Sequence, residues 1–109
     1  MKDDRTLLIH IIECIRRIEE DGTEGYDLFI RSHTLQDAIL RNLQIMAESA
    51  GRLSPAIKEA HPEIEWRKLS AFRNILVHDY LGIDMDQIWA IATRDVPALK
   101  RFALRILDE

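Results

Sequence analysis

Apolar residues recur along this chain at steps of three and four positions, which is the period of an α-helix that buries one face. Between residues 3 and 20, one stripe contains Leu8, Ile11, Ile12, Ile15 and Ile18. From Thr34 onward the steps are four, four, three, four and three, through Leu35, Ile39, Leu43, Met46, Ala50 and Leu53. A seam this regular is typical of a helix at the centre of a bundle.

Polar residues, glycines and prolines mark where the helices should begin and end. We expect helices over residues 3–20, from 34, from 55 to 60, over 66–81 and from 85 onward. Residues 22–32 should be a connection, with room for one turn around Leu28 and Phe29. Thr34 and Asp37 resemble a capping box, with Asp in place of Glu or Gln, so the second long helix should start near Thr34. Gly82 should end the helix that begins at Trp66.

The last helical segment contains a proline, and no segment of the chain has the alternation of a strand. Pro97 lacks an N–H and should kink or split its helix near residues 93–96. The sequence therefore predicts an all-α bundle of four or five helices, in one domain over residues 1–109.

The composition is that of a globular domain, with 47% hydrophobic and 31% charged residues. A net charge of −4 argues against a general nucleic-acid coat protein but allows a local basic cleft. No run approaches the ~20 apolar residues of a membrane span, and the short apolar run at the start is not a signal peptide, so we expect a cytoplasmic protein. The single cysteine, Cys14, lies on an apolar stripe and should be a buried thiol; with the scattered histidines it gives no metal-site spacing, and we expect no cofactor.

The segment from Arg73 to Tyr80, Arg-Asn-Ile-Leu-Val-His-Asp-Tyr, carries the most chemistry per residue. Its three central apolar residues should anchor it to a core. Arginine binds phosphate, histidine transfers a proton, and asparagine positions either group. Together they suit metal-free cleavage of RNA, in which the ribose 2′-OH is the nucleophile and Arg73, Asn74 and His78 supply charge and proton transfer. Such a site cannot cut DNA, which lacks the 2′-OH.

On one helix, Asn74 and His78 are a turn apart, and Arg73 and Tyr80 also share a face. Arg73 and His78, however, point about 140° away from each other. Either the arginine bends around, the helix distorts, or a second copy supplies half of the site. We prefer the third solution, which makes a homodimer part of the mechanism.

The same residues also fit a structural role, in which they form salt bridges and cap carbonyls at the end of a bundle helix. On the residues alone this interpretation is slightly favoured. Glu48 is expected to be an ordinary solvated glutamate, with a partnership to Arg73 as the alternative; Glu48 and Asp79 are kept as supporting candidates. Four cations precede the segment and alternate with glutamates, which favours ordinary surface over a phosphate-binding patch: Arg52, Lys58, Arg67 and Lys68.

Taken with its flanks, the segment resembles the HepT-like proteins, minimal members of the HEPN superfamily and toxin halves of prokaryotic toxin–antitoxin pairs. The similarity covers nearly the whole chain. It is carried by Asp3-Asp4-Arg5, Gln36-Asp37-Ala38, Arg41-Asn42-Leu43, Glu48-Ser49-Ala50, Arg52-Leu53-Ser54-Pro55, Pro62-Glu63-Ile64-Glu65-Trp66-Arg67, Arg73-Asn74, His78-Asp79-Tyr80-Leu81-Gly82-Ile83-Asp84 and Trp89.

The resemblance implies an all-α homodimer with active clefts at the subunit interface, and metal-independent ribonuclease activity centred on Arg73 and His78 with Asn74 in support. It also implies a partner, a small MNT-type nucleotidyltransferase antitoxin that silences the toxin by transferring AMP from ATP to Tyr80. The alternative is a catalytically inactive HEPN module that pairs with the nucleotidyltransferase or binds nucleotides. The intact motif favours the ribonuclease, and the acidic net charge favours the module.

Overall fold

The structure is a computed structural model and describes residues 3–108, apart from the side chain of Tyr80. Every regular element in this range is helical, which confirms the predicted all-α class. The elements are α1 (Asp4–Asp21), α2 (Tyr26–Arg31), α3 (His33–Gly51), α4 (Pro55–Ala60), α5 (Trp66–His78), the 3-10 turn η1 (Tyr80–Gly82), α6 (Met85–Ala90), the π-helical turn η2 (Ile91–Asp95) and α7 (Val96–Leu107). Four long stretches form the bundle (α1, α3, α5 and the α6–η2–α7 run), and α2 and α4 are short.

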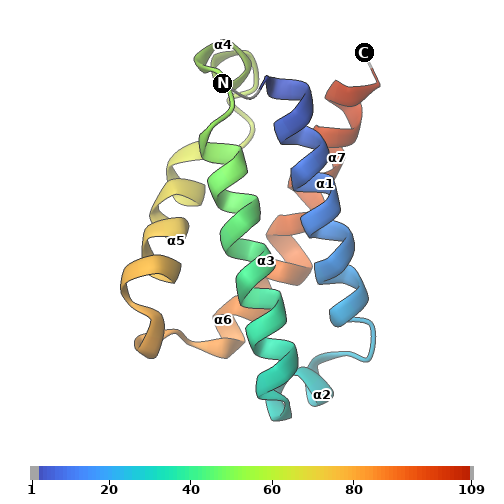
Figure 1. The fold of residues 1–109 in the computed structure, drawn as a ribbon, viewed down its shortest axis with the longest axis vertical. Helices are drawn as coiled ribbons and strands as arrows, with labels where there is room; N and C mark the ends of the chain where they lie inside the picture. Colours follow the sequence, from blue (N-terminus) through green and yellow to red (C-terminus); the bar gives the residue numbers. More distant parts are fainter. Residues whose placement is uncertain (1–2, 109) are drawn as a thin grey trace.

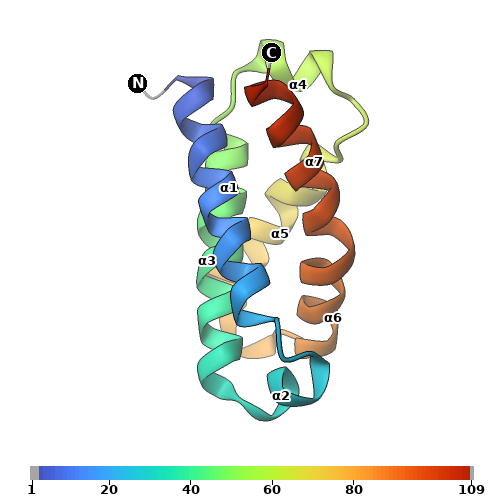
Figure 2. The same cartoon turned by 90° about the vertical axis from the view of Figure 1, so that its right-hand side faces the viewer.

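As its regular seam predicted, α3 lies at the centre of the bundle. It packs against α1 on one flank and against α5 on the other (Figure 1). The helices α5, α3 and α1 thus lie in a row. The last stretch, α7, packs along α1 on one side of this row (Figure 2). Because α5 packs chiefly against α3, it keeps a wide face toward solvent.

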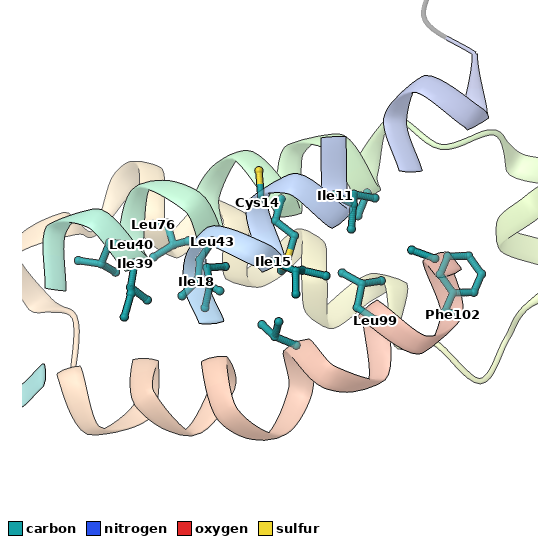
Figure 3. Close-up of a cluster of buried hydrophobic side chains, with 14 of the residues drawn as sticks. Ile11, Cys14, Ile15, Ile18, Ile39, Leu40, Leu43, Leu76, Leu99 and Phe102 are labelled. Carbon is teal, nitrogen blue, oxygen red and sulfur yellow. The ribbon is translucent and has the colours of Figure 1, made fainter. Parts of the chain in front are cut away.

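The core lies where α1, α3 and α7 meet, and its buried side chains form one cluster (Figure 3). Members drawn there include Ile11, Ile15 and Ile18 from α1, Ile39, Leu40 and Leu43 from α3, and Leu99 and Phe102 from α7. Cys14 is buried at 6% exposure, and burial raises the pKa of its thiol, as expected of a structural rather than a reactive cysteine.

The N-terminal ends of α1 and α4 are joined by hydrogen bonds to the Asp4 side chain. Asp4 Oδ1 accepts from the backbone N–H of Ser54 at 2.8 Å, and Asp4 Oδ2 accepts from Ser54 Oγ at 2.6 Å. Ser54 Oγ in turn accepts from Ile57 N at 3.2 Å and caps α4. One carboxylate therefore fixes the entry to α4 against the start of α1.

The central helix begins at His33, next to its predicted start near Thr34, but the predicted cap was wrong. Ser32, not Thr34, is the N-cap: its hydroxyl accepts from Leu35 N at 3.2 Å, and α3 begins at His33. The turn allowed around Leu28 and Phe29 in the connection is the short helix α2, whose Phe29 is fully buried. Ser32, one residue before His33, is itself a favoured N-cap residue and caps the helix in place of Thr34.

The predicted end of α5 was also wrong. The helix ends at His78, because Asp79 leaves helical geometry with φ −122° and ψ 41°. A 3-10 turn follows, in which Gly82 N donates to Asp79 O at 3.1 Å. His78 is therefore the last residue of α5, and the backbone of Tyr80 belongs to the 3-10 turn rather than to that helix.

Pro97 splits the last helix, as predicted, but it does so through a π turn. A proline ring clashes with the carbonyl four residues back and offers it no N–H. Here that carbonyl belongs to Thr93, which lies inside η2, and Val96 N bonds instead to Ile91 O, five residues back. Within residues 3–108, no helix is both long and apolar enough to cross a membrane.

Candidate functional site

The Arg73–Tyr80 segment occupies the C-terminal half of α5 and the turn after it. Of its three apolar residues only Leu76 is buried, at 5% exposure. Ile75 is 48% exposed and Val77 36% exposed, so the expectation that all three anchor the segment was wrong for these two. A helix buries only one face, and the residues before and after Leu76 point away from that face. Ile75 and Val77 therefore leave apolar surface exposed beside the motif.

Arg73 lies in a hollow between α3 and α5 with a volume of about 270 Å³. Its lining, here named the Arg73 hollow, consists of Ala47, Glu48, Gly51 and Arg52 from α3 and Ser70, Arg73 and Asn74 from α5. Small residues at positions 47 and 51 leave this space open, and a Cβ added at Gly51 would meet nothing within 4 Å. The hollow is large enough for a phosphate group and its water.

Two neighbours hold the Arg73 guanidinium in this hollow. Its Nη2 lies 3.8 Å from Glu48 Oε1, and its Nη1 donates to Asn74 Oδ1 at 3.3 Å. The Arg73 and Glu48 side chains are 39% and 31% exposed, so their attraction is screened and worth about 1 kcal/mol or less. A bidentate phosphate can therefore displace Glu48 at little cost.

Glu48 is part of a longer chain of contacts along α3. Gln44 Nε2 donates to Glu48 Oε1 at 3.3 Å, one helical turn away. The sequence favoured an ordinary solvated glutamate here; the structure instead bears out the alternative, a partnership with Arg73. Asn74, expected to support the site, contacts Arg73 directly.

His78 is not brought to Arg73 within one chain. It is exposed at the end of α5 and does not line the Arg73 hollow. The undistorted helix between them keeps the divergence of about 140° expected from five helical steps. Asn74 and His78, one turn apart, are both exposed. One chain thus keeps the Arg73 guanidinium and the His78 imidazole apart.

Tyr80 and Asp79 follow the end of α5. The inference that Tyr80 shares a face with Arg73 assumed a helix that runs through Tyr80, and the end at His78 removes that basis. The Tyr80 side chain lies outside the described part of the structure. Asp79 is exposed, and its carboxylate lies beside Gly82, where an added Cβ would come within 3.1 Å of Oδ1.

Among the four cations before the motif, only Arg52 lines the hollow. Lys58 Nζ donates to Gly51 O at 2.7 Å, and Lys68 pairs with Glu65 at 2.8 Å, so ordinary surface was the right interpretation for these two. Arg52 was weighed as part of a phosphate-binding patch but assigned to ordinary surface, and Ser70 is a lining residue that the sequence did not single out. The signal for Arg52 was its position one turn after Glu48 on the same face of α3.

The remaining histidines lie apart from this site. His61 caps the end of α4, bonds Glu63 at 3.2 Å and packs edge-on against Phe102. His33 is exposed at the start of α3, and His10 is partly buried on α1. In the described range, no three His, Cys, Asp or Glu side chains are grouped so as to hold a metal ion.

Comparison with known proteins finds relatives that align with most of this chain. The family model described as "Ribonuclease HepT-like" matches residues 11–106. A Methanocaldococcus jannaschii protein named "Gamma-glutamylcyclotransferase and putative RNase" is 37% identical over 111 residues, covering 99% of this chain and 49% of that protein. The "Probable ribonuclease HepT" of Thermococcus cleftensis is 33% identical over 100 residues, covering 91% of each chain. A second M. jannaschii protein, named "Putative RNase", is 31% identical over 101 residues, covering 92% of this chain and 93% of that one.

The chain therefore spans about half the length of the first of these relatives and nearly all of the other two. No solved structure matches the chain. The family match includes all of α3 and α5, and with them the Arg73 hollow and His78. This chain belongs to the ribonuclease HepT-like family of the HEPN superfamily.

Proposed function

We propose that this protein is the toxin of a prokaryotic toxin–antitoxin pair and cuts RNA without a metal ion, at a site that two copies of the chain build together. The observation that carries the proposal is the separation of Arg73, held in a hollow, from His78, exposed on another side of α5. Exposed Ile75 and Val77 beside them give α5 an apolar surface suited to a second copy. A two-fold axis along α5 would bring the His78 of one subunit toward the Arg73 of the other.

In this mechanism His78 accepts the proton of the ribose 2′-OH, and O2′ attacks the adjacent phosphorus. The bond from phosphorus to O5′ breaks, which leaves a 2′,3′-cyclic phosphate and, once O5′ is protonated, a 5′-hydroxyl. Arg73 stabilises the charge on the non-bridging oxygens, with Arg52 as a second cation at the rim. Asn74 keeps the guanidinium in place through Oδ1.

The proposed partner is a nucleotidyltransferase antitoxin that attaches AMP to Tyr80. Tyr80 is two residues beyond His78 in sequence, and the attached AMP would carry a phosphate. That phosphate would compete with RNA for Arg73, which is a direct way to silence the enzyme.

Cleavage in EDTA, with His78→Ala and Arg73→Ala, tests the activity. The substrate is a mixture of tRNA and mRNA, and mass spectrometry confirms that Tyr80 carries no AMP. We expect cleavage by the wild type and none by either variant. His33→Ala and Arg67→Ala are the matched controls, because they remove the same side chains from exposed positions outside the hollow.

Mixing the two inactive variants tests whether the site is shared. If each site takes Arg73 from one subunit and His78 from the other, every mixed dimer has one intact site, and random mixing restores about a quarter of wild-type activity. A site built within one chain stays inactive on mixing. Restored cleavage supports the shared site, and inactivity of the mixture contradicts it.

The second candidate is a catalytically inactive module that binds the nucleotidyltransferase or nucleotides. Glu48 favours it, because a carboxylate 3.8 Å from the Arg73 guanidinium competes with an RNA phosphate, and so does the net charge of −4. Equal background cleavage by unmodified wild type and His78→Ala would support this module over the ribonuclease.

A further inference from the structure

A second hollow lies between α3 and the end of α5, beside the Arg73 hollow. It has a volume of about 200 Å³. Its lining, here named the Gln44 hollow, consists of Asp37, Leu40, Arg41, Gln44, Leu76 and Ile83. Leu76 is the one residue of the Arg73–Tyr80 segment in this lining, and the proposed chemistry does not use the hollow.

The two hollows are consecutive stretches of one groove. The α3 residues that line them follow one helical stripe at steps of three and four: 37, 40, 41 and 44 in the Gln44 hollow, then 47, 48, 51 and 52 in the Arg73 hollow. The hydrogen bond from Gln44 to Glu48 joins the two linings. One helical turn, or about 6 Å, separates these two residues along α3, a distance that a single ribose spans between a phosphate and its base.

The size and floor of the Gln44 hollow suit one flat ring system. Ligand pockets for whole cofactors usually measure about 300–1,000 Å³, so 200 Å³ is too small for a complete nucleotide. Leu40 and Leu76 are 9% and 5% exposed and form an apolar floor together with Ile83, which is partly buried. Bases of single-stranded RNA bind by placing their faces on such surfaces.

The rim of the hollow is polar, and its groups favour particular bases. Asp37, exposed at one edge, accepts hydrogen bonds only. Gln44 uses one N–H for Glu48, but a carboxamide carries two N–H donors and a carbonyl. Acidic side chains accept from the exocyclic amine of cytosine, and amides pair with adenine. Uracil has no exocyclic amine. Arg41, exposed beside them, suits the next phosphate of the strand.

We propose that the Gln44 hollow is a base-binding subsite: it receives the base next to the phosphate held by Arg73 and prefers amino-bearing bases over uracil. Asp37 and Gln44 read the amino edge. The inference rests on the proposed function, because it takes the ligand of the groove to be an RNA strand. It adds a determinant of where that strand is cut.

Binding of short 2′-O-methyl oligonucleotides tests the subsite without relying on cleavage, since they lack the nucleophile. Adenine, cytosine and uracil homopolymers are compared by fluorescence anisotropy on wild type, Gln44→Ala and Asp37→Asn. Gln87→Ala is the matched control, an exposed glutamine on α6 outside both hollows. Asp37→Asn removes a negative charge and so strengthens binding of every oligonucleotide; the ratio of affinities between bases is therefore the readout.

For wild type and Gln87→Ala we expect the adenine and cytosine oligonucleotides to bind about tenfold more tightly than uracil. In Gln44→Ala and Asp37→Asn this ratio should fall to about threefold or less. Equal affinities for the three bases in wild type would overturn the subsite, and so would a ratio that the two substitutions leave unchanged, or no binding at all.

The same oligonucleotides with free 2′-OH groups separate the subsite from the ribonuclease. Cleavage that needs His78 but ignores the base leaves the proposed function standing and removes the subsite. Base-dependent binding without cleavage leaves the subsite standing and removes the proposed ribonuclease. Gln44→Trp fills the hollow: loss of base discrimination with an unchanged oligomeric state, measured by light scattering, supports a base as the occupant. A changed oligomeric state with base discrimination retained would identify a second copy there and overturn the proposal.

Discussion

Nη2 of Arg73 lies 3.8 Å from Oε1 of Glu48, and the same carboxylate oxygen accepts a hydrogen bond from Gln44. Two helices that are far apart in sequence thus place an acidic side chain next to the guanidinium of the motif. The carboxylate holds Arg73 in the hollow and also occupies the electrostatic position that a phosphate needs.

Glu48→Gln should therefore strengthen RNA binding. The amide removes the competing charge, and because the pair is partly exposed we expect a gain of up to about fivefold, with unfolding free energy changed by about 1 kcal/mol or less. The measurement is the Kd for a non-cleavable RNA at two salt concentrations, and the gain should shrink at high salt.

Glu19→Gln is the control for this prediction. Glu19 forms an ion pair with Lys100 at 2.9 Å between α1 and α7, away from the hollow, and its removal changes net charge equally. Equal gains in both variants would mean that net charge alone is responsible. A loss of affinity in Glu48→Gln would mean that Glu48 positions Arg73 more than it competes with RNA.

The bundle should depend on Phe102 far more than on its neighbour Leu104. Phe102 is 2% exposed and packs against the rings of Trp66 and His61 at centroid distances of 5.5 and 5.1 Å, whereas Leu104 is 47% exposed. Phe102→Ala should cost about 3–5 kcal/mol of unfolding free energy through the cavity it leaves. Leu104→Ala should cost about 0.5 kcal/mol. Urea unfolding of both variants measures the difference, and similar losses would contradict the described packing of α7.

The bundle was predictable from sequence because burial imposes a period on the chain. Ile39, Leu43 and Met46 repeat at helical steps, and all three are buried in α3 as that repeat requires. The helix break at Pro97 was equally predictable, because its missing N–H and its ring act on the backbone directly. The form of the break, a π turn, depends on how α6 and α7 both reach the core and could not be read from the proline alone.

Helix ends and cross-helix contacts were less predictable. The end of α5 depends on the backbone of Asp79, whose φ and ψ are set by the turn into α6 rather than by side-chain pattern. The Glu48–Arg73 contact depends on the register of α3 against α5, and the sequence gives only a separation of 25 positions (73 − 48). Motif residues are recognised by type and spacing, whereas their partners become known only through packing.

Asp4 should contribute to stability through Ser54. Asp4→Ala removes two hydrogen bonds, of 2.8 and 2.6 Å, that join the start of α1 to the cap of α4. We expect a loss of about 1–2 kcal/mol in unfolding free energy. A double-mutant cycle with Ser54→Ala separates the contact from other effects of each substitution. Additive losses would show that the two side chains contribute independently and would contradict their coupling.

Stability should fall as the pH rises into the alkaline range, and Cys14 should account for part of the fall. Burial raises the pKa of its thiol above the ordinary 9.0. From about that pH the unfolded chain releases the proton while the folded chain still binds it. The unfolded state then binds fewer protons, so the free energy of unfolding decreases with pH until the folded-state pKa is passed. Tyr26 acts in the same direction, because its hydrogen bond to Asp86 raises the phenol pKa above 10.0.

Urea unfolding at neutral pH and above pH 10.0 measures this dependence for wild type, Cys14→Ala and Tyr26→Phe. The readout is the change in unfolding free energy between the two pH values, since Cys14→Ala also leaves a small cavity that lowers stability equally at both. Each substitution should reduce that change, and the two reductions should add because the side chains lie on different helices. If Cys14→Ala keeps the full wild-type dependence on pH, the thiol does not retain its proton above pH 9.0 in the folded state, and its burial does not contribute to the dependence.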